Sequence, residues 1–271
     1  MTRRLPGALL GALVLTQICY PLTAGGLRAG LTVLTVLLGY LLSVSHAWLS
    51  RGLRSVVALV ATATLGGFAV EAVGVATGFP FGGYDYSGQL GPKLLGVPLI
   101  IPLAWTWMAW PAWLAAVRST RRRPARVALA GAGLAAWDLF LDPQMVAEGY
   151  WRWPAPTPAL PGVPGIPIGN YLGWLGFALV LMAVLAVAAG PRAAVPDDRD
   201  RPIRVLWYWT YASSVLAHAV FLGLPWSTLW GGLVMGAVVI PPAVRDIRAV
   251  RESRAARLSA ARGLSWRGRP V

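Results

Sequence analysis

Long apolar runs dominate this sequence, and each is long enough, or nearly so, to cross the hydrocarbon core of a lipid bilayer. A segment inside lipid must pair its backbone hydrogen-bonding groups internally, so such runs predict helices and not lone strands. Hydrophobic residues make up 56% of the chain and charged residues only 13%, a balance that excludes an ordinary soluble domain. The sequence therefore predicts an all-α, polytopic membrane bundle of about eight transmembrane helices. The predicted spans are 5–24, 27–49, 55–78, 94–117, 126–146, 168–190, 203–222 and 224–243.

Three of these spans depend on local signals. The first follows Arg3 and Arg4 and so also resembles a secretory signal peptide. We interpret it as the first membrane helix, because no small-x-small cleavage site closes it and further spans follow. The last two spans are divided by the turn signal Gly223-Leu224-Pro225.

The distribution of positive charge predicts how the bundle is oriented. With both termini in the cytoplasm, 21 of the 24 Lys and Arg residues fall on the inside, and Arg28, Lys93 and Arg152 fall on the outside. We therefore expect a multi-pass protein of the cell membrane, with an integral membrane domain at 1–244 and a basic, disordered cytoplasmic tail at 245–271. A contact of this tail with anionic lipid is an alternative. The net charge of +14 does not indicate nucleic-acid binding, because the arginines lie between apolar runs and not along one face.

Carboxylates inside the apolar runs are the candidate functional groups. An ionisable side chain in a membrane helix costs roughly 2.5–3.5 kcal/mol or more, so it is seldom present without a use. Asp138 and Asp142 are four residues apart and share one helix face, and Glu71 falls in the same outer half of the predicted bundle. Two outside loops, 79–93 and 148–167, are rich in Gly, Pro and aromatic residues. The sequence therefore predicts a pocket at the outer face.

Asp138 and Asp142 also have purely structural interpretations. Asp142 precedes Pro143, so the helix can break there with Asp142 as the N-cap of a short new helix. Asp138 can instead form a buried hydrogen bond or ion pair between helices.

The other candidate polar residues have similar alternatives. Glu71 can pair with Arg152 or Lys93 near the interface. His218, in the outer half of the seventh run, either joins the site or forms a polar bridge between helices. His46, near the inner end of the second run, is interpreted as structural.

Metal, cofactor and disulfide chemistry find no support in the sequence. No His, Asp and Glu set has metal-ligand spacing, and phosphate-binding and dinucleotide-binding motifs are missing. Cys19 is the sole cysteine and is expected to be a small apolar filler. Trp174, Trp226 and Trp230 are expected in an interfacial aromatic belt.

The predicted pocket suits acid chemistry on a lipid. A carboxyl group surrounded by apolar side chains can stay protonated near neutral pH and give its proton to an alkene carbon. A neighbouring carboxylate and aromatic faces would stabilise the resulting cation, and a second carboxylate would guide water to it. The substrate would reach the pocket from the bilayer, and no cofactor is needed.

Several sequence blocks around these carboxylates carry a family resemblance. They are Thr-Gly-Phe-Pro-Phe-Gly-Gly-Tyr-Asp-Tyr at 77–86, Leu-Gly-Pro-Lys at 90–93, Trp-Asp-Leu-Phe-Leu-Asp-Pro-Gln-Met at 137–145, Gly-Tyr-Trp at 149–151 and Asn-Tyr-Leu-Gly-Trp at 170–174. With them, residues 65–175 resemble the carotenoid biosynthesis membrane proteins typified by CruF-type carotenoid 1,2-hydratases.

The resemblance implies a hydro-lyase that hydrates the terminal 1,2 double bond of an acyclic, ψ-end carotenoid and forms a tertiary 1-hydroxy group. The expected partners are this membrane-embedded polyene, the lipid bilayer and other carotenoid-pathway enzymes. A carotenoid end-group isomerase or cyclase, a lipid carrier and a non-catalytic scaffold for the pathway are the alternatives. Carboxylates gathered at one side, without an internal repeat, favour an enzyme over a transporter.

Roles for individual residues follow from the proposed chemistry. We expect Asp138 to be the proton donor, with Asp142 or Glu71 as charge stabiliser and water guide. Asn170 would hold the water or, alternatively, act as N-cap of the sixth helix. The residues expected around the substrate end group are Trp137, Tyr84, Tyr86, Tyr150, Trp151, Asn170 and His218.

Overall fold

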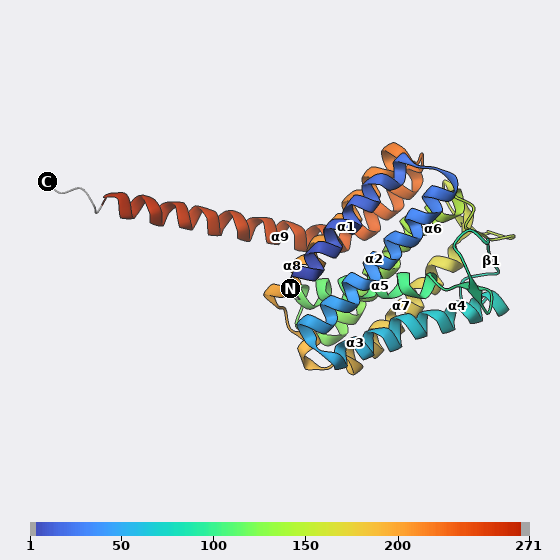
Figure 1. Cartoon of the computed structure of the whole chain (residues 1–271), viewed down its shortest axis with the longest axis horizontal. Helices are drawn as coiled ribbons and strands as arrows, with labels where there is room; N and C mark the ends of the chain where they lie inside the picture. The colour runs from blue at the N-terminus through green and yellow to red at the C-terminus, as the bar shows by residue number, and fades with distance from the viewer. Residues whose placement is uncertain (1–3, 267–271) are drawn as a thin grey trace.

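Helices form nearly all of the apolar sequence in the computed structural model, which describes residues 4–266 (Figure 1). The predicted all-α class is confirmed, because the strands in this part of the chain are short and lie in loops. The helices are α1 (Leu5–Cys19), η2 (Tyr20–Leu22), α2 (Gly25–Arg51), α3 (Leu53–Leu59), η3 (Val60–Leu65), α4 (Gly66–Thr77), α5 (Ile101–Ser119), α6 (Arg123–Ala147), α7 (Ile168–Ala188), η4 (Pro191–Ala194), η5 (Asp198–Asp200), α8 (Arg201–Leu216), η6 (Ala217–Phe221) and α9 (Pro225–Trp266). The strands are β1 (Asp85–Tyr86), β2 (Lys93–Leu94), β3 (Val97–Pro98), β4 (Trp151–Arg152), β5 (Ala159–Leu160) and β6 (Val163–Pro167).

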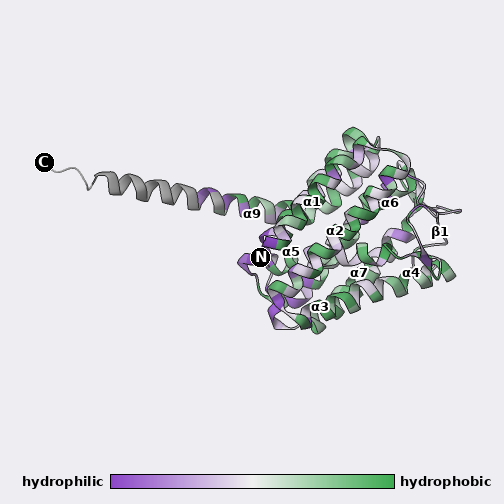
Figure 2. Cartoon of the chain, in the orientation of Figure 1, coloured by the Kyte–Doolittle hydropathy of each residue, from purple (hydrophilic) through white to green (hydrophobic). Residues whose placement is uncertain are grey.

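The helices have the length and the surface of a membrane bundle. Within the described residues, 6 helical segments are long and apolar enough to span a bilayer, with α3, η3 and α4 forming one of them. The remaining two predicted spans are also helical, in α5 and α8. Figure 2 shows hydrophobic residues along the helices and hydrophilic ones gathered near the N-terminus and the α2–α3 turn. The count of eight spans and the cytoplasmic position of both termini stay predictions.

α5 is the central helix of the bundle. It packs against α2 on one side and α6 on the other, and most of its side chains are buried. α6 in turn packs against α7 and α9. Because α6 lies among other helices, its buried face can carry the carboxyl groups of Asp138 and Asp142, which a lipid-facing surface could hold only at high cost.

Gly39 lets α2 approach α5 closely, and its replacement by alanine is expected to destabilise the bundle. A Cβ atom at this position would lie 2.4 Å from the ring of Trp107. Overpacking of this kind costs about 1–3 kcal/mol, so the thermal unfolding midpoint of the protein in detergent should fall. Gly30→Ala is the matched control, because it lies on the same helix with open space around the added Cβ atom. Equal midpoints for the two variants would contradict this close packing.

The predicted helix break before Pro143 is wrong, because α6 continues through this proline to Ala147. Proline has no N–H group, so it leaves the carbonyl of Leu139, four residues earlier, without its helical partner. The hydroxyl of Ser227, on α9, donates to that carbonyl oxygen at 2.7 Å. A neighbouring helix thus replaces the lost hydrogen bond, as is common for prolines within membrane helices. Asp142 therefore lies inside α6 and is not an N-cap.

The two predicted outside loops meet at one end of the bundle. Strand β1 from the first loop pairs with β4 from the second, so that Asp85 faces Arg152 and Tyr86 faces Trp151. In Figure 1 this end lies opposite the N-terminus and the point where α9 leaves the bundle.

The C-terminal helix α9 is helical as far as Trp266, in a region where the sequence was expected to be disordered. Residues 267–271 of the predicted tail lie outside the described residues, and the division at 244 and 245 stays a prediction.

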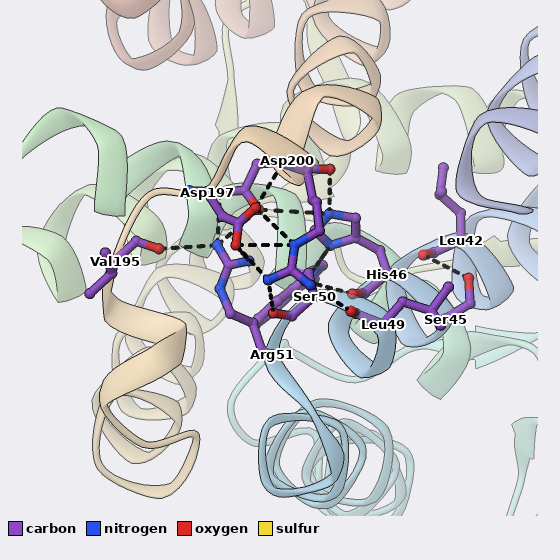
Figure 3. A network of polar contacts seen from close by, with 11 residues as sticks. Leu42, Ser45, His46, Leu49, Ser50, Arg51, Val195, Asp197 and Asp200 are labelled. Atoms are coloured by element: carbon purple, nitrogen blue, oxygen red, sulfur yellow. Dashed lines mark hydrogen bonds and ion pairs between the residues drawn. The ribbon is translucent and has the colours of Figure 1, made fainter. Parts of the chain in front are cut away.

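A buried polar network closes the opposite end (Figure 3). Arg51 donates from Nη2 to both carboxylate oxygens of Asp200 at 2.8 Å. Nε2 of His46 lies 3.0 Å from the carbonyl oxygen of Arg199, in agreement with the structural role predicted for this histidine. The hydrogen-bonded Arg199 side chain holds the pKa of the Asp197 carboxyl well below its usual range. The network joins the end of α2 to the segment before α8.

Candidate active site

Glu71 is the first carboxylate of the site, and it projects from α4 into the interior with an exposed fraction of 3%. The hydroxyl groups of Tyr84 and Tyr86 donate to its Oε2 atom at 2.5 and 2.8 Å. Nε1 of Trp105 donates to Oε1 at 3.0 Å. The predicted alternative, an ion pair with Arg152 or Lys93, is therefore wrong. Three neutral donors are oriented to stabilise negative charge on this group.

The first loop reaches Glu71 because α4 ends at a glycine. Gly78 has a φ of +78°, the left-handed conformation that commonly terminates a helix, and turns the chain back along α4. Gly74 leaves space for the returning chain, since a Cβ atom there would lie 2.8 Å from the Tyr84 hydroxyl. Burial, the negative charge of Glu71 and the hydrogen bond to it raise the pKa of Tyr84 above its usual value. The phenol therefore keeps its proton and remains a donor.

Asp138 and Asp142 form the second part of the site, on the face of α6 that meets α7. Nδ2 of Asn170 donates to Oδ2 of Asp138 at 3.0 Å and also to Oδ2 of Asp142. Nε1 of Trp151 donates to Oδ1 of Asp142 at 3.1 Å. The predicted N-cap role of Asn170 is wrong, because α7 begins earlier and Asn170 instead faces α6. One amide group thus bridges two buried carboxyl groups.

A cavity of about 1230 Å³, including its open mouth, joins the two parts of the site. Glu71 and Asp142 both line it, so the predicted convergence of these carboxyl groups is found in the structure. Asp138 does not line the cavity and lies behind Asp142 with no exposed surface. The predicted lining residues that do border it are Trp137, Tyr84, Tyr86, Trp151 and Asn170.

Tyr150 and His218 were expected around the substrate and do not line the cavity. Nδ1 of His218 lies 2.9 Å from Oγ of Ser227, and its Nε2 lies 3.2 Å from Oε1 of Gln144. His218 is therefore the polar bridge between helices that was the alternative interpretation. Gln144, which it contacts, does line the cavity and was not predicted.

Tryptophan rings form much of the cavity wall, and several of these tryptophans were not predicted from the sequence to lie there. Trp105 and Trp174 stack with centroids 3.9 Å apart and planes inclined by 12°. Trp153 lines the same cavity and donates to the carbonyl of Phe81 at 2.9 Å. The expectation that Trp174 belongs to an interfacial belt is wrong, because it is buried in this wall. The Gly-Trp pair at 173–174 follows Asn170 closely in the sequence, and this proximity could have indicated that Trp174 lies in the cavity wall.

One cross-strand pair connects the two carboxyl groups. Tyr86 donates to Glu71 and Trp151 donates to Asp142, and these two aromatic residues face each other across β1 and β4. Their rings meet edge to face with centroids 5.5 Å apart.

Among the side chains that the structure describes, no three His, Cys, Asp or Glu residues are grouped to hold a metal ion. The independence of the reaction from a cofactor stays a prediction.

Comparison with known proteins gives two findings. Residues 31–240 match the protein family described as carotenoid biosynthesis protein. Over 127 residues, 45% of this chain, the sequence is 38% identical to the bisanhydrobacterioruberin hydratase of Haloarcula japonica. The matched segment covers 41% of the length of that relative. No solved structure matches the chain.

Proposed function

We propose that this chain adds water to the terminal double bond of an acyclic carotenoid. The premise is that the chain belongs to the carotenoid biosynthesis protein family, as the match over residues 31–240 shows. The observation that carries this proposal is the pair of carboxyl groups, Glu71 and Asp142, on the wall of an aromatic cavity inside a membrane bundle. The hydratase name of the relative from Haloarcula japonica supports the same reaction.

The first step is proton transfer from the Asp138 and Asp142 pair. Two carboxyl groups that share one amide donor repel each other when both are ionised, so the pair is suited to hold one proton. Because Asp142 lines the cavity and Asp138 does not, we assign the transfer to Asp142 and the role of its proton-sharing partner to Asp138. The O–H bond of the acid breaks, a C–H bond forms at carbon 2 of the polyene, and carbon 1 becomes a tertiary cation.

The second step is the capture of this cation. The ionised form of Glu71, held by its three donors, and the ring faces of the cavity wall stabilise the positive charge. The oxygen of a water molecule forms a bond to carbon 1, and one proton of that water returns to the Asp142 carboxylate. The product is a tertiary alcohol, and the acid pair is restored.

The membrane setting fits this substrate. We expect the polyene to reach the cavity from the bilayer, within the cell membrane, and to pass to or from other carotenoid-pathway enzymes. The cavity is lined largely by aromatic and other apolar side chains, which suit the hydrocarbon end group of a polyene.

Expression of the chain in a host that makes an acyclic carotenoid tests the proposal. Mass spectrometry of the extracted pigments should show a product heavier by one water molecule, which the same host without the chain does not make. A new product of unchanged mass would instead indicate an isomerase or cyclase. Recovery of the starting polyene alone, with the protein present in the membrane, would favour a carrier or scaffold.

A further inference from the structure

The cavity has a second region whose lining differs from the aromatic wall. Hydroxyl and amide side chains from α1, α2 and α8 border it. Thr32 and Thr35 are three residues apart on α2, and Thr210, Ser213 and Ser214 follow the same face of α8. We call the region lined by these five residues and Gln17 the hydroxyl arm.

The three helices around the hydroxyl arm are neighbours. α1 packs on α2, and both contact α8. Nε1 of Trp209, on α8, donates to Oε1 of Gln17, on α1, at 2.7 Å. The residues of the arm thus come from three helices in mutual contact, whereas Trp105, Trp153 and Trp174 come from α5, the loop after β4 and α7.

Three residues that line the cavity, Thr35, Thr210 and Trp107, have a buried polar atom without a protein partner. Oγ1 of Thr35, Oγ1 of Thr210 and Nε1 of Trp107 have no hydrogen-bond partner among the described residues, although the side chains are only 8%, 1% and 4% exposed. Thr32, one turn from Thr35, instead donates to the carbonyl of Arg28 in its own helix. A buried polar group left unpaired costs about 1–3 kcal/mol, so these groups require a polar ligand.

We propose that the hydroxyl arm binds water and supplies the molecule that is added to the polyene, an inference that rests on the proposed function. Water can satisfy both donors and acceptors, and the apolar polyene can satisfy neither. The arm and Asp142 border one cavity, and Gln144, held by His218, lines the cavity on the same helix as Asp142. The aromatic wall and the hydroxyl arm therefore separate the polyene from its co-substrate until the cation forms.

Loss of the bound water changes the fate of the cation in a way that can be measured. Without water, the cation gives a proton from carbon 2 or from an adjacent methyl group back to the Asp142 carboxylate, and an alkene forms again. In heavy water the acid carries deuterium, so the forward step forms a C–D bond. Loss of a protium then leaves deuterium in a polyene that has gained no water.

The test compares Thr35→Val with Thr210→Val, singly and together, in membranes incubated with an acyclic carotenoid in heavy water. We expect hydrated product to fall about tenfold in the double variant, while deuterium continues to enter the unhydrated polyene. Thr35→Ser and Thr210→Ser keep the hydroxyl groups and should keep hydration. Thr16→Val is the control, because its buried hydroxyl is bonded to the carbonyl of Ala12 and does not line the cavity.

Two results would overturn the proposal. Unchanged hydration in the double valine variant would show that the arm does not supply the water. Hydration and deuterium incorporation that fall together would assign the threonines to polyene binding or to folding. A wild-type protein that adds neither water nor deuterium would instead contradict the proposed function itself.

Discussion

Replacement of Asp142 by asparagine is expected to reduce the hydrated carotenoid by at least about 100-fold, while the unhydrated polyene accumulates. Asparagine has nearly the same shape but cannot release a proton to carbon. The asparagine oxygen can still accept from either Asn170 or Trp151, while its NH₂ group faces the other donor, so the variant loses one hydrogen bond at about 1–3 kcal/mol and hydration is compared per amount of protein in the membrane. Pigment analysis by mass spectrometry, together with the amount of protein in the membrane fraction, measures both quantities.

Two further variants make this result interpretable. Asp85→Asn removes an exposed loop carboxylate on β1 and should leave hydration unchanged. Asp138→Asn is also expected to cause accumulation of the unhydrated polyene, because it removes the group that shares the proton. If Asp138→Asn abolished hydration and Asp142→Asn did not, the donor would be Asp138 and the assignment made from the cavity lining would fail.

Replacement of Glu71 by glutamine is expected to lower hydration by about 100-fold, because it removes the negative charge that stabilises the cation. The same change places an NH₂ group opposite one set of donors, either Tyr84 and Tyr86 or Trp105. A buried donor without an acceptor costs about 1–3 kcal/mol, so the thermal unfolding midpoint in detergent should also fall.

The two effects of Glu71→Gln can be separated. Hydration per folded molecule, assayed well below the unfolding midpoint, reports the loss of charge. Glu252→Gln, an exposed carboxylate on α9, is the matched control and should change neither quantity. Normal hydration per folded molecule would leave Glu71 with a structural role alone.

The predicted membrane topology was the basis for placing the carboxyl groups and the aromatic loops at one end of the bundle. The alternation of charge placed Glu71 and Asp142 in the same half of the bundle, and both line one cavity. It also placed the two aromatic loops on one side, where β1 and β4 pair. These predictions needed the order of the spans, the hydropathy of each run and the distribution of positive charge between them.

Local rules failed where a distant residue supplied the missing interaction. A helix break at Pro143 was one alternative, but Ser227, 84 positions later in the sequence, donates to the freed carbonyl of Leu139. An N-cap of its own helix was the alternative role for Asn170, which instead donates to two aspartates of another helix. Contacts of this kind depend on how helices pack, which the spacing of residues within one run does not specify.

The β1–β4 ribbon has a consequence for substrate choice. Its Tyr86 and Trp151 each donate to one acid, so the separation between the proposed proton source and the proposed anion is set partly by a short antiparallel strand pair outside the helices. Altering this ribbon would change the width of the end group that fits between the two acids, with neither acid replaced. Selectivity among polyenes can therefore evolve in the loops while the lipid-embedded scaffold stays constant.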